Sequence, residues 1–314
     1  MTGYIVRRIG LAAVTVLLVL LFAFSIIRLI PGDVVQLMVA EQGYAADVEA
    51  LRRQLGLADP IHVQFSRWMG NALQGDFGQS LWTKRSVVEE LKRRLPISAE
   101  LGAYAIIFGL AIGLPVGTLA AIRQDSWMDY LARSSAIALL SVPGFWMATL
   151  ILVFPLKWFG WTPPLRYYSW TDDPWQHFTF FLLPAAILGY ALAGGIMRLT
   201  RTMMLEVLRQ DYIRTAWSKG LRERVVVVRH GLRNALIPVV TLLGLQFGFV
   251  ISGTVITESI FNVPGVGRYF FESILNRDYP AIQGIVFFTA SIVVLLNLVV
   301  DIAYAYIDPR IRYL

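Results

Sequence analysis

The stretch Ile9–Ile27, with the sequence IGLAAVTVLLVLLFAFSII, contains no Asp, Glu, Lys or Arg. A helix needs about 20 largely apolar residues to cross the hydrocarbon core of a bilayer. Backbone polar groups cannot remain unpaired in lipid, and fully buried strands reach only about 4–8 residues. We therefore predict a membrane-spanning helix over this stretch.

Five further stretches downstream have the same character. They also lack charged residues, and they are Leu101–Ile122, Ser134–Leu156, Phe178–Met197, Asn234–Thr257 and Pro280–Val300. The chain has 314 residues, of which 56% are hydrophobic and 16% charged, whereas soluble domains carry about 25% charged residues. The pattern predicts an all-α polytopic membrane protein with six transmembrane helices. The absence of cysteine excludes disulfides and thiolate metal sites.

The first apolar stretch has features of a signal peptide, because Arg7 and Arg8 precede it. However, the apolar part of a signal peptide is usually about 7–15 residues long and is followed by a cleavage site with small residues. This stretch is longer and no such site follows it. We therefore expect a retained transmembrane helix.

Lys and Arg in short loops predict which helix ends face the cytoplasm. With six spans, both termini lie on one side, together with loop 198–233, which holds nine Lys or Arg and three acidic residues. The short loops of the other side, 157–177 and 258–279, hold only four basic residues. Loop 31–95 on that other side carries eight basic residues, but loops beyond about 60 residues translocate largely regardless of charge. We therefore expect both termini in the cytoplasm.

The spans and loops predict three regions along the chain. Apolar residues at helical spacing over Asp47–Leu57 and Val87–Leu95, with glycine and proline turn signals between them, predict that the long external loop is structured. The regions are an N-terminal transmembrane helix at 1–30, an external loop region at 31–95, and a five-helix core at 96–314 that contains the cytoplasmic loop 198–233.

The cytoplasmic loop contains the segment DYIRTAWSKG, residues 211–220. Asp211 is a suitable N-cap, Lys219 suits the negative end of the helix dipole, and Gly220 can adopt the left-handed conformation that ends a helix. We therefore predict a short helix from Asp211 to Lys219. Its expected apolar stripe is Tyr212, Ala216 and Trp217.

A helix of this length is marginal alone and needs a surface to pack on. Two interpretations stay open from the residues themselves. The helix either rests on anionic lipid headgroups, as basic amphipathic segments commonly do, or docks on a protein.

The segment resembles the cytoplasmic coupling loop of binding-protein-dependent ABC importer permeases, in which Gly220 corresponds to the invariant glycine. Arg214 and Thr215 stand where Glu and Ala are usual in that loop, and only Ala216 matches. The pattern DYIRTAxxKGL, followed by RHGLRNALIP at 229–238, is similar to the variant found in the dipeptide, oligopeptide and nickel branch.

Other features of that branch occur along the whole chain, and the long first external loop is typical of the first of its two permeases. They are IPGD at 30–33, QLGL at 54–57, GDFGQS at 75–80, ESIFNVPGVG at 258–267, RDYP at 277–280, NLVVD at 297–301 and Tyr304–Arg310.

The resemblance implies a permease subunit with the type I ABC importer fold in the bacterial inner membrane. It implies a heterodimer with a second permease, two cytoplasmic ATPases that bind ATP and Mg, and an external substrate-binding protein. The implied cargo is short peptides, with glutathione, nickel chelates, opines and oligosaccharides as alternatives within the branch. The residues implied to couple to the ATPases are Asp211, Tyr212, Arg214, Thr215, Ala216, Trp217, Lys219 and Gly220.

No enzyme motif and no cofactor motif is evident in the chain itself. It lacks a phosphate-binding glycine-rich loop with its lysine, and His62, His177 and His230 are dispersed and predicted on loops. An ion-coupled secondary transporter is the alternative function, but such carriers often place ionisable residues inside spans and these spans have none. A membrane enzyme would need a cluster of acids, bases or metal ligands in a span.

Polar side chains inside spans are candidates for lining the translocation pathway. Ser141, Gln246 and Ser252 are such residues, since a polar group at lipid depth is costly unless it faces a cavity or a neighbouring helix. Hydrogen bonding between helices is the alternative role for each of them.

Overall fold

Helices form all the named secondary-structure elements in the described part of the chain, which also holds one isolated bridge between Gln79 and Ser86. The structure is a computed structural model that describes residues 2–29, 34–37, 48–54, 56–164 and 166–307. The motif at 30–33, Asp47 and the last residues of the chain lie outside the described residues. So do the side chains of Gln246 and Ser252, although both residues belong to a described helix.

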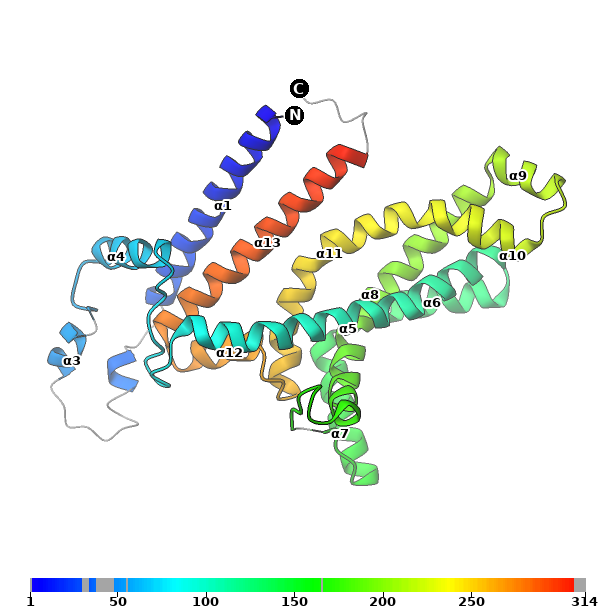
Figure 1. Cartoon of the computed structure of the whole chain (residues 1–314). Helices are drawn as coiled ribbons and strands as arrows, with labels where there is room; N and C mark the ends of the chain where they lie inside the picture. The colour runs from blue at the N-terminus through cyan, green and yellow to red at the C-terminus, as the bar shows by residue number, and fades with distance from the viewer. Residues whose placement is uncertain (1, 30–33, 38–47, 55, 165, 308–314) are drawn as a thin grey trace. The chain divides into compact units, whose positions relative to one another are not determined.

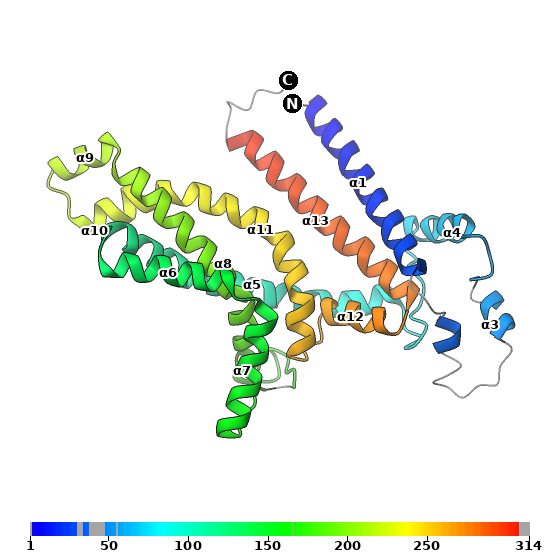
Figure 2. The ribbon, with the colours of Figure 1, turned by 180° about the vertical axis from the view of Figure 1, so that it is seen from behind.

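Figures 1 and 2 show the helices from opposite sides. Their bounds are α1 Thr2–Leu29, α3 Val48–Gln54, α4 Ile61–Leu73, α5 Val87–Ile122, α6 Trp127–Ser141, α7 Gly144–Phe159, α8 Pro174–Leu208, α9 Asp211–Ser218, α10 Glu223–Val225, the π-helix η1 Val226–Leu232, α11 Arg233–Ile260, α12 Val266–Leu275 and α13 Tyr279–Ile307.

The chain divides into two compact units, 1–96 with 265–314, and 97–264. The first boundary lies beside the expected boundary at 95/96, but α12 and α13 belong to the unit of the N-terminal residues. The expected division into 1–30, 31–95 and 96–314 therefore differs from the grouping of the structure.

In the first unit, α1 and α13 lie side by side along their lengths (Figures 1 and 2). Beside them, Phe77, Val87 and Leu91 are buried in one apolar cluster with Tyr269 and Ile285. This cluster joins the segment before the second predicted span to α12. The expected structured loop is therefore present, and its C-terminal part packs on α12 and the start of α13.

The second unit is centred on α8, whose apolar side chains are extensively buried against α6, α7 and α11. The close approach of α8 to α5 requires glycine at position 113 of α5. A Cβ on Gly113 would lie 2.8 Å from Cβ of Ile196 and 2.9 Å from the carbonyl oxygen of Ala193, both in α8. Small residues at such contacts let helix backbones approach closely and pack through many van der Waals contacts.

Among the described residues, four helices are long and apolar enough to span a membrane, over Arg7–Arg28, Val87–Ile122, Pro174–Leu208 and Tyr279–Val299. The predicted third span, Ser134–Leu156, is not one helix. It consists of α6 and α7, which meet at an angle of 94°, so the expectation of a continuous span is wrong there. Pro143 explains the break, because proline lacks an N–H and disfavours helical backbone at the preceding residue.

The helix bounds correct one further expectation and confirm another. The three histidines lie in helices rather than loops, with His62 in α4, His177 in α8 and His230 in η1. The segment Val87–Leu95 is helical as predicted, and it continues into the second span as one helix of 36 residues.

Candidate functional site

Helix α9 is the element predicted to couple to partner subunits. It runs over Asp211–Ser218, and its N-cap is Gln210, which has extended backbone and makes no capping bond. Asp211 is therefore the first helical residue and not the N-cap that we predicted. Its carboxylate instead lies 3.3 Å from the guanidinium of Arg214, and it remains in the first turn, where a negative charge suits the helix dipole.

Helix α9 ends as predicted, with Gly220 in the left-handed conformation after its last turn. Gly220 has a φ of 73°, its N–H donates to the carbonyl of Trp217 at 2.9 Å, and the N–H of Leu221 donates to the carbonyl of Ala216 at 3.4 Å. These two bonds form a Schellman motif, which satisfies carbonyl groups that would otherwise be free at the helix end. Lys219 is the C-cap residue, one position beyond the last helical residue.

The face on which α9 packs differs from the predicted stripe. Ile213 and Ala216 are buried against Val226 and Leu208, whereas Tyr212 and Trp217 are 43% and 45% exposed. Of the predicted stripe, only Ala216 lies on the packed face, because η1 covers the side of the helix that carries Ile213. Ile213 is the residue that sequence reasoning missed, and its three-residue spacing to Ala216 was the available signal.

The outward surface of α9 combines aromatic and basic groups. Tyr212, Arg214, Thr215, Trp217 and Lys219 are all exposed. The Tyr212 hydroxyl accepts a hydrogen bond from Asn234 Nδ2 at 2.9 Å, which orients its ring. Exposed Tyr, Trp and Arg side chains of this kind are enriched at protein interfaces. We call these five residues the α9 surface.

The position of α9 is fixed by two long helices. It follows α8 directly, and it packs on η1, which continues into α11. Figures 1 and 2 show α9 at the end of the α8 and α11 pair. π-helical segments are rare and occur frequently at functional sites.

A buried ion pair joins α8 to α6 near this end of the unit. Arg201 donates from Nε and Nη2 to the two carboxylate oxygens of Asp129, at 2.5 and 2.7 Å. Asp129 is fully buried and also accepts the backbone N–H of Asp125. Bidentate arginine–carboxylate pairs fix geometry as well as charge, so α6 is tied to the last turns of α8.

The break between α6 and α7 brings polar backbone into the middle of the predicted third span. The Tyr190 hydroxyl of α8 donates to the carbonyl oxygen of Val142, which belongs to the break. Ser141 is exposed, and its hydroxyl donates to the Ile137 carbonyl at 2.8 Å within its own helix. Non-helical backbone at membrane depth is tolerated where it is buried in protein or lines a water-filled cavity.

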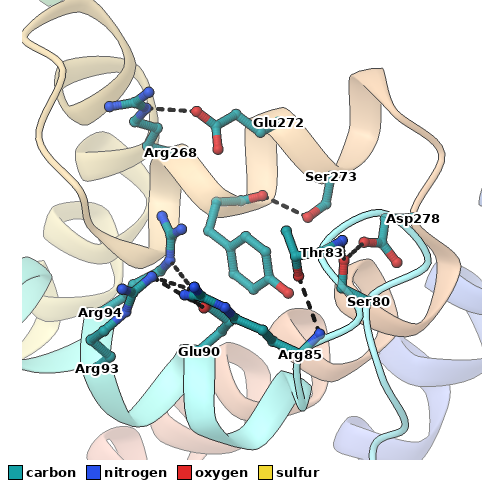
Figure 3. A network of polar contacts seen from close by, with 11 residues as sticks. Ser80, Thr83, Arg85, Glu90, Arg93, Arg94, Arg268, Glu272, Ser273 and Asp278 are labelled. Carbon is teal, nitrogen blue, oxygen red and sulfur yellow. Dashed lines mark hydrogen bonds and ion pairs between the residues drawn. The ribbon is translucent and has the colours of Figure 1, made fainter. Parts of the chain in front are cut away.

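A second polar cluster lies in the first unit, beside α12 (Figure 3). Glu90 is buried and receives hydrogen bonds from Arg85, Arg93 and Arg94. In the same view, Ser80 donates to Asp278 at 2.5 Å. Burial raises the pKa of Asp278, while the bond from Ser80 acts in the opposite direction.

The described residues contain no group of three or more His, Cys, Asp or Glu placed to hold a metal ion. His177 has a structural connection instead: one ring nitrogen lies 2.7 Å from a carboxylate oxygen of Glu100 and the other lies 2.8 Å from the Tyr168 carbonyl. Neither this contact nor the Asp129–Arg201 pair was predicted, because each joins residues about 70 to 80 positions apart.

Comparison with known proteins relates this helical architecture to a family. Residues 113–313 match the binding-protein-dependent transport system inner membrane component, and residues 1–102 match the N-terminal part of such membrane components. The chain belongs to this family. It is thus a permease subunit of an ABC importer and an inner-membrane component, as the sequence resemblance predicted, and it is not itself the catalytic component.

Close relatives cover the chain from end to end. The glutathione transport system permease protein GsiC of Salmonella paratyphi A is 40% identical over 313 residues, and that of Escherichia coli strain K12 is 38% identical over 314 residues, with full coverage of both chains in each case. A crystal structure of an amino acid ABC transporter shares the fold, with a TM-score of 0.51 and 16% identity. The match covers 71% of this chain and 95% of that one. These relatives confirm the predicted fold class and show that the secondary-transporter alternative is wrong.

Proposed function

We propose that this permease forms half of a translocation pathway with a second, homologous permease, and that two separate cytoplasmic ATPases drive it. The proposal places both termini and loop 198–233 in the cytoplasm, with an external binding protein delivering the substrate to the opposite side. The charge distribution of the short loops supports this orientation. The chain itself carries no cofactor in this proposal, and ATP and Mg bind to the ATPases.

The α9 surface is the proposed contact with an ATPase. Its support is one observation: a two-turn helix with a defined end exposes two aromatic and two basic side chains while Ile213 and Ala216 attach it to the bundle. Rigid-body displacement of α9 would move α8 and α11 together, because both are connected to it. Such motion can exchange inward for outward access.

Gly220→Val tests this role, and Gly160→Val is a matched control. Gly160 also ends a helix with a positive φ, 61°, and neither glycine has a described atom within 4 Å of its potential Cβ. A side chain in this conformation costs roughly 1–2 kcal/mol in either place. We expect only Gly220→Val to uncouple ATP hydrolysis from transport or to lower co-purification of the ATPases, with normal membrane insertion in both.

Charge reversal separates protein docking from lipid anchoring. Under the docking proposal, Arg214→Glu weakens ATPase co-purification in every lipid mixture. If α9 instead rests on anionic lipid, the loss of activity follows the anionic lipid content and the ATPases stay bound. Full coupling and full ATPase retention in Gly220→Val would contradict the docking proposal.

For the substrate, we infer a short peptide and select glutathione as the first to test. The inference is supported by full-length relatives named as glutathione transport permeases. In vesicles with the complete transporter, labelled glutathione uptake should require ATP and the binding protein. If the vesicles instead take up labelled dipeptides, and unlabelled glutathione does not inhibit that uptake, the result would favour short peptides in general as the substrate class.

The break at Val142 and Pro143 is the proposed polar part of the pathway wall, with Ser141 beside it. Gln246 and Ser252 remain proposed lining residues from the sequence. Because the chain has no cysteine, Ser141→Cys can be labelled by a water-soluble thiol reagent in the assembled transporter. We expect labelling there and block of uptake, but no labelling at Val153→Cys within the apolar part of α7. Equal protection of both positions would contradict the assignment.

A further inference from the structure

Helix α9 is attached to the next long helix of the chain at two separate points. α10, η1 and α11 follow one another without a break, so residues 223–260 form one continuous helix with a π-helical segment near its start. The first attachment is apolar and lies at the beginning of η1, where Ile213 and Ala216 of α9 pack on the fully buried Val226. The second attachment is polar and lies just beyond the end of η1, at Asn234.

Asn234 makes the polar attachment with the amide group of its side chain. Its Nδ2 donates to the Tyr212 hydroxyl of α9 at 2.9 Å and to the backbone carbonyl of His230, in η1, at 3.0 Å. An amide nitrogen carries two donor hydrogens, and a carbonyl oxygen only accepts, so the contact with His230 fixes which end of the amide faces both partners. The side chain of Asn234 therefore bridges α9 and the end of η1.

The two attachments lie on either side of the π-helical segment. Val226 is the first residue of η1, and Asn234 is the second residue after its end. The last turns of α8 approach the same segment closely, because a Cβ on Gly231 would lie only 3.3 Å from Cε of Met204 and 3.4 Å from Cδ2 of Leu208. π-helical turns are rare and occur frequently at functional sites. η1 is therefore the segment at which α8, α9 and α11 meet.

Two attachment points fix the direction of α9, whereas the apolar one alone does not. Apolar contacts are non-directional, so the packing on Val226 holds α9 in place without setting its angle. A hydrogen bond has a preferred distance and angle. The bond from Asn234 acts eight positions farther along the helix than Val226, roughly 10 Å away, and so it prevents α9 from pivoting about the apolar contact.

We propose that Asn234 is a positioning residue for energy coupling. Its bond to Tyr212 holds α9 at a fixed angle to the helix of residues 223–260, so that a displacement of α9 is passed to α11 instead of being absorbed as a tilt of α9. This inference rests on the proposed contact between the α9 surface and an ATPase. The property that Asn234 controls is the amount of substrate transported for each ATP hydrolysed.

The test measures this ratio in vesicles that contain the complete purified transporter. The transported probe is labelled glutathione, or the labelled dipeptide that the substrate test selects. Asn234→Leu removes both hydrogen bonds with a side chain of similar size, and Tyr212→Phe removes only the hydroxyl that accepts one of them. We expect each variant to lower the ratio about 5-fold, the size of effect expected from one hydrogen bond. Because both changes break the same bond, the double variant should also lower it only about 5-fold.

Ser218→Ala is the matched control. The Ser218 hydroxyl is also on an exposed residue of α9, but it donates to the Thr215 carbonyl within the same helix, at 3.0 Å. Its removal should leave the ratio unchanged. The ratio also separates positioning from folding, because a bond that only stabilises the fold would lower the thermal midpoint and reduce uptake and ATP hydrolysis together.

Three outcomes would overturn the proposal. They are a parent-like ratio in Asn234→Leu, an equal loss in Ser218→Ala, and losses that multiply in the double variant, which would show that Asn234 and Tyr212 act separately. Failure of the proposed ATPase contact is recognised independently. Arg214→Glu leaves both bonds of Asn234 in place, and in that case it would retain the ATPases.

Discussion

Asp129→Leu should be among the most destabilising single changes in the second unit. Asp129 is fully buried and Arg201 is 18% exposed, so the substitution leaves a guanidinium in a largely dry site without its carboxylate. Removing one partner of a buried pair costs about 3–5 kcal/mol, and the partial exposure of Arg201 favours the lower end, about 3 kcal/mol. At about 2–4 °C per kcal/mol for 150–250 residues, the thermal midpoint should fall by roughly 6–12 °C.

The assay is a double-mutant cycle on the detergent-purified transporter. Arg201→Met alone should also destabilise, but Asp129→Leu with Arg201→Met should recover part of the loss, because two apolar side chains replace the pair. Recovery is incomplete because Arg133, 3.5 Å from the same carboxylate, still loses this partner. The solvent-accessible pair Asp59–Arg67 provides the comparison, and Arg67→Met should change stability by no more than about 1 kcal/mol. Additivity of the two buried-site changes within about 0.5 kcal/mol would refute the coupling that we derive from the 2.5 and 2.7 Å contacts.

Two further substitutions test packing and buried polarity. Gly113→Ala should destabilise the protein because its Cβ would lie 2.8 Å from Ile196. Gly195→Ala has no described atom within 4 Å of its Cβ, so it should be neutral or stabilise by up to about 1 kcal/mol. The thermal midpoint should therefore fall in the first variant and stay unchanged or rise in the second. Ser80→Ala removes the hydrogen bond that opposes the raised pKa of Asp278, so this pKa should rise further. A carboxyl group with a raised folded-state pKa loses stability as pH rises through that pKa. The midpoint deficit of Ser80→Ala should therefore be larger near pH 7 than near pH 4, and a pH-independent deficit would contradict the role of Asp278.

The sequence predicted most of the fold because lipid imposes simple rules. Uncharged stretches of about 20 residues correspond to helices at five of the six predicted positions, including α11 over the fifth. The exception is the predicted third span, which consists of α6 and α7. Hydropathy could not reveal its break, since a break at Pro143 leaves the apolar composition unchanged. Proline is also present inside α7 and α8, at Pro155 and Pro184, so its presence alone does not locate a break.

The site was predictable where local backbone chemistry decides it. The left-handed conformation of Gly220 follows from the residue type. The packed face of α9 instead depends on its contact with η1, which precedes α11 and adjoins α9 only in the folded chain. Tertiary contacts such as His177 with Glu100 join positions remote in sequence, and periodicity within one helix carries no information about them.

The length of α8 has a consequence for the orientation of α9. At a rise of 1.5 Å per residue, its 35 residues extend over about 52 Å, against a hydrocarbon layer of about 30 Å. Beyond Pro184 the helix contains no other proline, so its last turns form a stiff rod that ends at Leu208. Each residue of a helix turns the chain by about 100°. One amino acid inserted after Thr202 would therefore rotate the α9 surface by about 100° around the axis of α8. Four inserted residues would nearly restore its original direction and would move it about one helical turn along that axis. The direction in which α9 faces therefore depends on the number of residues along α8 as well as on the packing of α9 against η1.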